Sequence, residues 1–204
     1  MTTIALVRHG RTQWNEEQRI QGRTNLALTA RGRDDILQLA SFVSLMNPAV
    51  IYTSPVARAF ESARLLMQDC QRALVEEESF TELDVGEWCG KRGGELTNTA
   101  EWSEYISDPS TFTPPSGESI QNMNVRVIHA IERIIAVHPH ERILIVTHGD
   151  CIRAAICHYI GLPLKCMHSL QVDLGSISVL SIEAERSILL GLNHPFSWPS
   201  DRGA

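Results

Sequence analysis

The chain of 204 residues is long enough to bury a sizeable core and fits one domain, which we expect to span residues 1–204. A hydrophobic content of 43% and a charged content of 21% are those of an ordinary globular protein, and the net charge of −6 argues against nucleic acid or an anionic membrane as a partner. No segment approaches the length of a membrane span and no signal-like sequence opens the chain, so we expect a cytoplasmic location.

The cysteines are odd in number and lack paired CxxC spacing. This pattern is typical of reduced intracellular thiols rather than of a disulfide framework or a zinc site. They are Cys70, Cys89, Cys151, Cys157 and Cys166.

The first predicted strand, residues 4–7, is an apolar run that ends at Arg8, His9 and Gly10. Such a run, bounded by a turn, is typical of a buried strand in a parallel sheet. Because ligand crevices in these sheets lie beyond the carboxyl ends of the strands, Arg8 and His9 are candidates for a binding site. On this stretch alone, a strand that ends in ordinary solvated polar residues is an equally good interpretation.

A polar loop follows from Gly10 to Leu28, which is long enough to suggest a functional role. We then expect a helix from an N-cap at Thr29 to about Met46, followed by a short strand at 49–53.

Ser54 and Pro55 predict the N-cap and first position of a second helix, which should reach about Gln71. This helix carries Arg58 in its first turn, where the helix dipole disfavours a cation by up to about 1 kcal/mol. A basic side chain beside exposed helix N–H groups is better explained if an anion binds there.

The remaining predicted elements are a strand at 73–75, a short helix at 95–106, a long helix from about 119 to 137, a strand at 142–147, a helix at about 151–160, strands at 176–182 and 187–192, and a tail over the last ten residues. Strands that alternate with helices predict an α/β fold. We expect a three-layer α/β/α sandwich with a mostly parallel central sheet and one antiparallel strand near the C-terminus.

A pocket for a phosphoryl group is the best explanation of three polar positions. His9 and His148 each follow an apolar strand and precede a glycine, and Arg58 begins a helix. Histidine serves as nucleophile or acid/base, arginine binds phosphate or carboxylate, and glycine lets a ligand approach the backbone. For His148 considered alone, a histidine satisfied by its own loop would be the better interpretation.

Short motifs occur in order over most of the chain. They are residues 6–15, Gly22 with residues 28–32, residues 54–59, Glu82 with residues 86–88, residues 115–119 and residues 146–149. Together they resemble the motifs of the histidine phosphatase superfamily, the phosphoglycerate-mutase-like proteins. The segment from Glu76 to Gly94 has neither helix nor strand periodicity and should leave the sheet edge, so we expect an excursion at about 76–117 that covers the active site.

The resemblance also implies roles for individual residues. His9 corresponds to a nucleophile that becomes phosphohistidine, and Glu82 to a general acid and base, although Asp84 and Glu87 are equally suitable on chemistry alone. Further members of the phosphate pocket are Arg8, Arg58 and His148. Substrate contacts are implied for Arg11, Asn15, Gln21, Gly22 and Gly149.

The implied activity is that of a metal-independent phosphatase without a cofactor, acting on a small phosphorylated metabolite. Two arginines can supply the charge neutralisation that a metal supplies in other phosphoryl-transfer sites. The same arginines favour a neutral His9, and its second ring nitrogen should donate to a local carbonyl group. The molecule is expected to be a monomer or a homodimer.

Two alternatives share this pocket: a cofactor-dependent phosphoglycerate mutase and a non-catalytic phosphate-binding regulator. Mutases of the family carry a longer basic insertion after the acid, whereas Lys91 and Arg92 are the only basic pair here. Asn25, Ala27 and Cys89 depart from the family pattern around the pocket mouth, so sugar phosphates, phosphoglycerates and ribazole phosphate all remain candidate substrates. No GxGxxG follows the first strand, which argues against a dinucleotide-binding domain.

Overall fold

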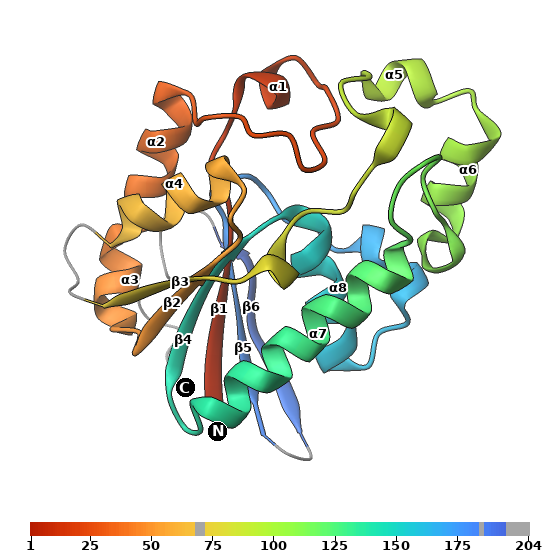
Figure 1. Ribbon diagram of the computed structural model, residues 1–204. Coiled ribbons are helices and arrows are strands. Elements are labelled where there is room, and N and C mark those ends of the chain that lie inside the picture. Colours follow the sequence, from red (N-terminus) through yellow and green to blue (C-terminus); the bar gives the residue numbers. More distant parts are fainter. Residues whose placement is uncertain (68–71, 184–185, 195–204) are drawn as a thin grey trace.

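The structure is a computed structural model that describes residues 1–67, 72–183 and 186–194. A six-stranded sheet in the order β3-β2-β4-β1-β5-β6 forms its centre (Figure 1). The strands are β1 (Thr2–Arg8), β2 (Val50–Thr53), β3 (Ala73–Glu76), β4 (Arg142–Thr147), β5 (Ile177–Ile182) and β6 (Ser187–His194). Among these described strands β5 alone runs against the others, because it is antiparallel to both β1 and β6. The predicted mostly parallel sheet is confirmed.

Helices cover both faces of the sheet (Figure 1). They are α1 (Gln13–Glu16), α2 (Ala30–Leu37), α3 (Ala40–Met46), α4 (Ala57–Leu66), α5 (Gly93–Leu96), α6 (Ala100–Ser107), α7 (Ile120–Val137) and α8 (Gly149–Ile160), with short 3-10 turns at Glu78–Phe80, Gly86–Trp88, Pro109–Thr111 and Leu164–Ser169. Alternate residues of β1 enter opposite cores: Ile4 and Leu6 pack with α7 and α8, and Ala5 and Val7 pack with α2, α3 and α4. The predicted three-layer sandwich is therefore confirmed.

The helix expected over residues 29–46 is two helices, α2 and α3. Thr29 is the N-cap of α2 as predicted, since its hydroxyl accepts from the Gly32 N–H. At the break, the Leu39 N–H donates to the Ile36 carbonyl in a tight turn that buries both side chains. Because the apolar residues keep their helical spacing through the turn, the sequence pattern predicts one continuous helix, whereas the structure has two.

Two further helix boundaries differ from the prediction. The helix expected at 95–106 is divided into α5 and α6, since Thr99 caps the second by accepting from the Trp102 N–H. The helix expected from Pro55 begins at Ala57, since the Ser54 hydroxyl accepts from the Val56 N–H and forms a turn instead. That helix, α4, ends at Leu66, and residues 68–71 of its predicted continuation lie outside the described residues, as does the predicted tail at 195–204.

The loop predicted at 10–28 contains the short helix α1. Thr12 caps it by accepting from the Asn15 N–H, and the Asn15 side chain accepts from the Thr12 N–H in return. The cap holds the chain in place directly after His9.

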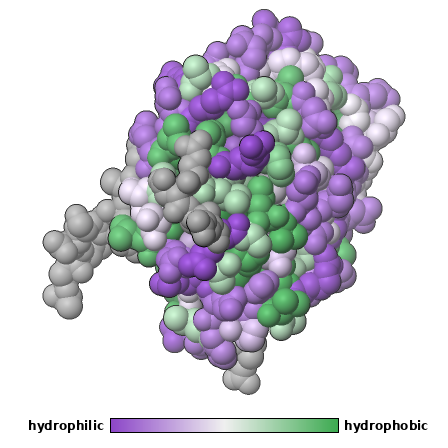
Figure 2. Space-filling view, turned by 60° about the vertical axis from the view of Figure 1, so that its left-hand side comes forward, coloured by the Kyte–Doolittle hydropathy of each residue, from purple (hydrophilic) through white to green (hydrophobic). Residues whose placement is uncertain are grey.

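Among the described residues, no helix has both the length and the apolar character that crossing a membrane requires. Figure 2 brings the α2–α4 side of the molecule forward and shows hydrophilic and hydrophobic residues interspersed over that face. The most exposed large hydrophobic residue on this layer is Leu45 of α3, at 83%. Scattered apolar side chains of this kind are ordinary on a globular surface.

Two glycines allow the backbone that follows β1 to pack directly against the first turn of α2. A Cβ atom on Gly32 of α2 would lie 2.2 Å from the Arg11 carbonyl oxygen, and one on Gly10 would lie 2.5 Å from the Gly32 carbonyl oxygen. The first turn of α2 therefore rests directly on the backbone that follows His9.

We predict that Gly32→Ala lowers the free energy of unfolding by about 1–3 kcal/mol, because the added methyl group overlaps backbone that cannot move independently. The matched control is Gly94→Ala in α5, where no atom beyond the chain neighbours and the helix's own backbone lies within 4 Å of the added Cβ. It should raise stability by up to about 1 kcal/mol. Urea denaturation of both variants measures the difference, and equal stabilities would contradict the packing argument.

Candidate active site

Three neighbouring parallel strands bring the polar strand ends together. β2, β4 and β1 are adjacent in the sheet, and the residues that follow them are Ser54, His148 and His9. The His9 N–H donates to the Thr147 carbonyl across 3.0 Å, and the rings of His9 and His148 have centroids 5.2 Å apart. The two His-Gly turns thus meet at one end of the sheet.

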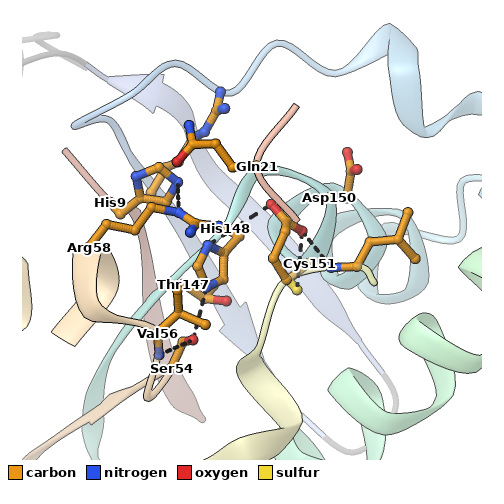
Figure 3. A network of polar contacts seen from close by, with 12 residues as sticks. His9, Gln21, Ser54, Val56, Arg58, Thr147, His148, Asp150 and Cys151 are labelled. Atoms are coloured by element: carbon orange, nitrogen blue, oxygen red, sulfur yellow. Dashed lines mark hydrogen bonds and ion pairs between the residues drawn. The ribbon is translucent and has the colours of Figure 1, made fainter. Parts of the chain in front are cut away.

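His9 is a neutral imidazole with a defined tautomer. The ring is 2% exposed, and Nδ1 lies 2.7 Å from the Gly10 carbonyl oxygen. Since a carbonyl oxygen only accepts, Nδ1 carries the hydrogen and Nε2 carries the lone pair. Donation from the His9 ring to a local carbonyl group is the contact that the sequence predicts. Nε2 accepts from Arg58 Nε across 3.1 Å (Figure 3). Burial, then Arg58 and Arg8, lower the pKa of His9 well below 6.5.

Arg58 is a buried cation held by neutral groups. Its guanidinium donates to the carbonyl oxygens of Gly22 at 2.7 Å and Thr24 at 2.9 Å, as well as to His9. Burial lowers its pKa to about 10, so the group remains charged near neutral pH. The first turn of its helix is supported from the same loop, because Asn25 Oδ1 accepts from the Ala57 N–H at 3.1 Å.

Arg8 is a second cation with unused donor capacity. Its Nη1 donates to the Val172 carbonyl at 2.6 Å, while its buried Nε has no hydrogen-bond partner among the described residues. Burial, then the charge of Arg153, lower the pKa of Arg8. Gly149 permits the close approach of α8, since a Cβ there would lie 3.3 Å from Arg8 Nε. An anionic oxygen is the partner that such a donor favours.

His148 lies behind the pocket rather than in its wall. It is completely buried, with Nε2 2.9 Å from the Ser54 hydroxyl and Nδ1 4.0 Å from Glu82 Oε2 (Figure 3). Nδ1 has no hydrogen-bond partner among the described residues. Burial, followed by the charge of Arg58, lowers the pKa of His148 well below 6.5, so this ring is also neutral.

Glu82 is the carboxyl group that faces this cluster. Burial and the neighbouring Asp150 raise its pKa to about 7, against the opposing effect of Arg58. Its Oε1 accepts from the Leu83 N–H at 3.0 Å. Asp84 binds the Gly86 N–H and Glu87 the Ser116 hydroxyl, and neither lines the pocket. Geometry therefore favours Glu82 among the three acids.

A pocket of about 180 Å³ opens at this end of the sheet. Of the residues expected in the site, those that line it are Arg8, His9, Asn15, Gln21, Gly22, Arg58 and Glu82. The expected residues outside the lining are Arg11, His148 and Gly149. Arg11 Nε lies 4.0 Å from an Asp35 carboxylate oxygen instead, so its role as a substrate contact stays a prediction.

Asn15 and Gln21 present amide groups to the pocket. The Asn15 Oδ1 accepts from the Thr12 N–H at 3.0 Å, and the Thr12 hydroxyl, which lies 3.0 Å from both side-chain oxygens, can donate its one hydrogen to Gln21 Oε1. These bonds occupy the acceptor ends, and leave the NH₂ groups as the donors for a ligand.

Comparison with known proteins agrees with this geometry. The family model of the histidine phosphatase superfamily (branch 1) matches residues 4–195. The chain belongs to this superfamily. Phosphoserine phosphatase 1 from Hydrogenobacter thermophilus is 28% identical over 195 residues, which cover 95% of this chain and 92% of that relative. The "Probable phosphoglycerate mutase GpmB" from Enterobacter sp. (strain 638) is 31% identical over 180 residues, 87% of this chain and 84% of the relative.

The fold also matches solved structures. The alpha-ribazole phosphatase from Shigella flexneri has a TM-score of 0.84 and 28% identity, with coverage of 94% of this chain and 96% of that one. Both the family and the fold that the sequence motifs predict are thus confirmed.

The pocket of this histidine phosphatase also contains residues for which the motifs imply no role in the site. They are Arg19, Ile20, Leu83, Val85, Trp88, Trp102, Tyr105 and Asp150. Trp102 and Tyr105 lie three positions apart on α6, a spacing that places two side chains on one helix face and could have indicated a shared role.

Arg126 of α7 holds the segment that carries Glu82. Its guanidinium pairs bidentately with Glu118, and it also donates to the carbonyl oxygens of Ser79, Thr81 and Glu82. Planar, multiple donation of this kind is specific to arginine. We infer that Arg126 positions the Glu82 backbone in this histidine phosphatase.

We predict that Arg126→Lys lowers the free energy of unfolding by about 2 kcal/mol, because an ammonium group cannot replace all of these bonds. It should also move the Glu82 carboxyl titration observed by NMR. The control is Arg133→Lys in the same helix, where the side chain is 58% exposed and pairs only with Glu77 among the described residues. Equal stabilities and an unmoved Glu82 titration would show that Arg126 does not position this segment.

Proposed function

We propose that the protein is a metal-independent phosphatase that hydrolyses a small phosphomonoester through a phosphohistidine on His9. One observation carries the proposal: the buried guanidinium of Arg58 and the half-buried guanidinium of Arg8 line the same pocket as the neutral imidazole of His9. Neither Arg8 nor Arg58 takes part in an ion pair within 4.0 Å among the described residues. Since buried charges are normally paired, this site favours a dianionic ligand.

The first step transfers the phosphoryl group to the enzyme. Phosphoryl oxygens accept from Arg8 and Arg58, and the Arg58 Nε–H turns from His9 Nε2 to the phosphate, which frees the lone pair. Nε2 then attacks phosphorus, the bond to the ester oxygen breaks, and Glu82 protonates that oxygen. Positioning and charge neutralisation are the main contributions that phosphoryl transfer asks of a protein.

The second step releases phosphate. The Glu82 carboxylate takes a proton from a water molecule as that water attacks phosphorus. The phosphorus–nitrogen bond breaks, its electron pair returns to His9 Nε2, and inorganic phosphate leaves.

His148 supports both steps from behind. The Ser54 hydroxyl, which accepts from the Val56 N–H, can donate its own hydrogen to His148 Nε2. Nδ1 then carries a hydrogen on the side of Glu82, whose Oε2 lies 4.0 Å away.

A phosphoglycerate mutase is the alternative, supported by the relative with 31% identity. A mutase must retain a second phosphate group, which requires further cations. Apart from Arg8 and Arg58, the one basic side chain in the described lining is Arg19, while Lys91 and Arg92 are exposed outside it. Hydrolysis is therefore the better-supported function, and a non-catalytic regulator is disfavoured because His9 and Glu82 are both present. A cytoplasmic location and a monomeric or dimeric state stay predictions.

We predict that wild-type protein mixed with ³²P-labelled aryl phosphate and quenched in alkali carries label that acid removes and base does not. His9→Ala should lose the label and lower hydrolysis by at least about 10³-fold, since the nucleophile is removed. EDTA should leave wild-type activity unchanged. Undiminished hydrolysis by His9→Ala would exclude His9 as the nucleophile, and inhibition by EDTA would exclude metal independence.

We predict that hydrolysis of alkyl phosphates falls above about pH 7. The raised pKa of Glu82, about 7, keeps the acid protonated below that pH and ionises it above. The lowered pKa of His9 leaves the nucleophile neutral, so no loss is expected on the acid side near pH 6.5. Glu82→Gln should abolish the alkaline decline and slow alkyl phosphates far more than 4-nitrophenyl phosphate. Equal slowing of both substrates would contradict general acid catalysis.

A further inference from the structure

The lining of the pocket has an apolar part, its apolar end, in addition to the two arginines. Trp88, Trp102 and Tyr105 form an aromatic wall there, and the apolar side chains that complete this end are Ile20, Leu83 and Val85. The aromatic wall is not part of the strand ends that carry His9 and Arg8: Trp88 lies in the 3-10 turn Gly86–Trp88, and the other two rings lie on α6. When a phosphate is bound by the two arginines, this apolar lining is part of the remaining surface that the alcohol portion of a phosphomonoester can contact.

The aromatic wall is rigid. Trp88 lies in the buried core and stacks on Phe112 at a centroid distance of 5.0 Å, and its ring is 5.6 Å from those of both Trp102 and Tyr105. The Tyr105 hydroxyl donates to Asp150 at 3.3 Å. A wall held by ring contacts and a hydrogen bond requires little ordering when a ligand binds.

The charges at this end are already compensated. Arg19 Nε pairs with a Glu17 carboxylate oxygen at 2.7 Å, and its Nη1 donates to the Gly90 carbonyl at 2.9 Å. Asp150 pairs with Arg153 Nη1 at 3.0 Å. Among the described residues, the apolar end therefore offers no unpaired cation to a substrate carboxylate.

We propose that the substrate is a phosphomonoester of an uncharged alcohol that carries a ring or a short apolar chain, rather than a phosphorylated carboxylic acid. This inference rests on the proposed phosphatase function and names its substrate class. A cavity of about 150 Å³ holds a benzene-sized ligand. The pocket of about 180 Å³ therefore holds a phosphoryl group and part of its leaving group, and the rest of the leaving group stays at the mouth.

Matched ligand pairs test the inference. Benzylphosphonate and 4-carboxybenzylphosphonate differ only in the carboxylate, and neither can be hydrolysed. We expect calorimetry to show at least tenfold tighter binding of benzylphosphonate. In hydrolysis, the kcat/KM for benzyl phosphate should exceed the values for 4-carboxybenzyl phosphate and for phosphoserine by a similar factor.

Variants assign the preference to the wall. Trp102→Ala should reduce the ratio of kcat/KM for benzyl phosphate over ethyl phosphate by about tenfold, and Trp102→Phe should restore most of it. Ile106→Ala is the control, because Ile106 lies on the same helix at 51% exposure and does not line the pocket. It should leave the ratio unchanged.

The outcomes separate the two proposals. Hydrolysis without selectivity, or tighter binding of the carboxylated ligand that Arg19→Gln abolishes, would overturn the substrate class and leave the phosphatase function standing. Selective binding of benzylphosphonate without hydrolysis of any ester would confirm the character of the pocket and overturn the phosphatase function.

Discussion

The hydrogen bonds of Arg58 join parts of the chain that are distant in sequence. One side chain in the first turn of α4 reaches the carbonyl oxygens of Gly22 and Thr24 and the ring of His9. Burying a guanidinium is costly unless its donors are satisfied, and carbonyl groups satisfy them without cancelling the charge. Arg58 therefore fixes the positions of the 10–28 loop, helix α4 and His9 relative to one another. Its positive charge is not neutralised by these bonds and can still attract a phosphate.

Burial acts on both reacting groups in a useful direction. Loss of water favours the uncharged form of any titratable group, which lowers the pKa of His9 and raises that of Glu82. The first step needs a base without a proton and an acid with one. A single property of the pocket, its poor solvation, prepares both groups near neutral pH, while the strand ends and the segment around Glu82 bring them from separate parts of the fold.

Much of the fold and of the candidate site could be predicted from residues whose local sequence pattern has a single physical explanation. Two apolar runs, each followed by His-Gly, correctly predicted that His9 and His148 follow the ends of neighbouring strands. The position of Arg58 in the first turn of a helix, where the helix dipole disfavours a cation, indicated an anion site. Glu82 could not be separated from Asp84 and Glu87 by chemistry, since a linear pattern does not show which carboxyl group becomes buried. The break before α3 was missed because apolar spacing continues through it, and the aromatic wall because its role depends on contacts between separate elements.

The contact between Gly10 and Gly32 restricts how this protein can change by mutation. A Cβ atom on Gly10 would overlap the Gly32 carbonyl group, and one on Gly32 would overlap the Arg11 backbone, so neither position tolerates a side chain while the other element stays in place. A viable path to a larger residue at either site requires a compensating shift of the start of α2, and the same shift would move the backbone beside His9. Sequence divergence in such a lineage should accumulate at the pocket mouth, around Asn25 and Cys89, before it reaches this pair.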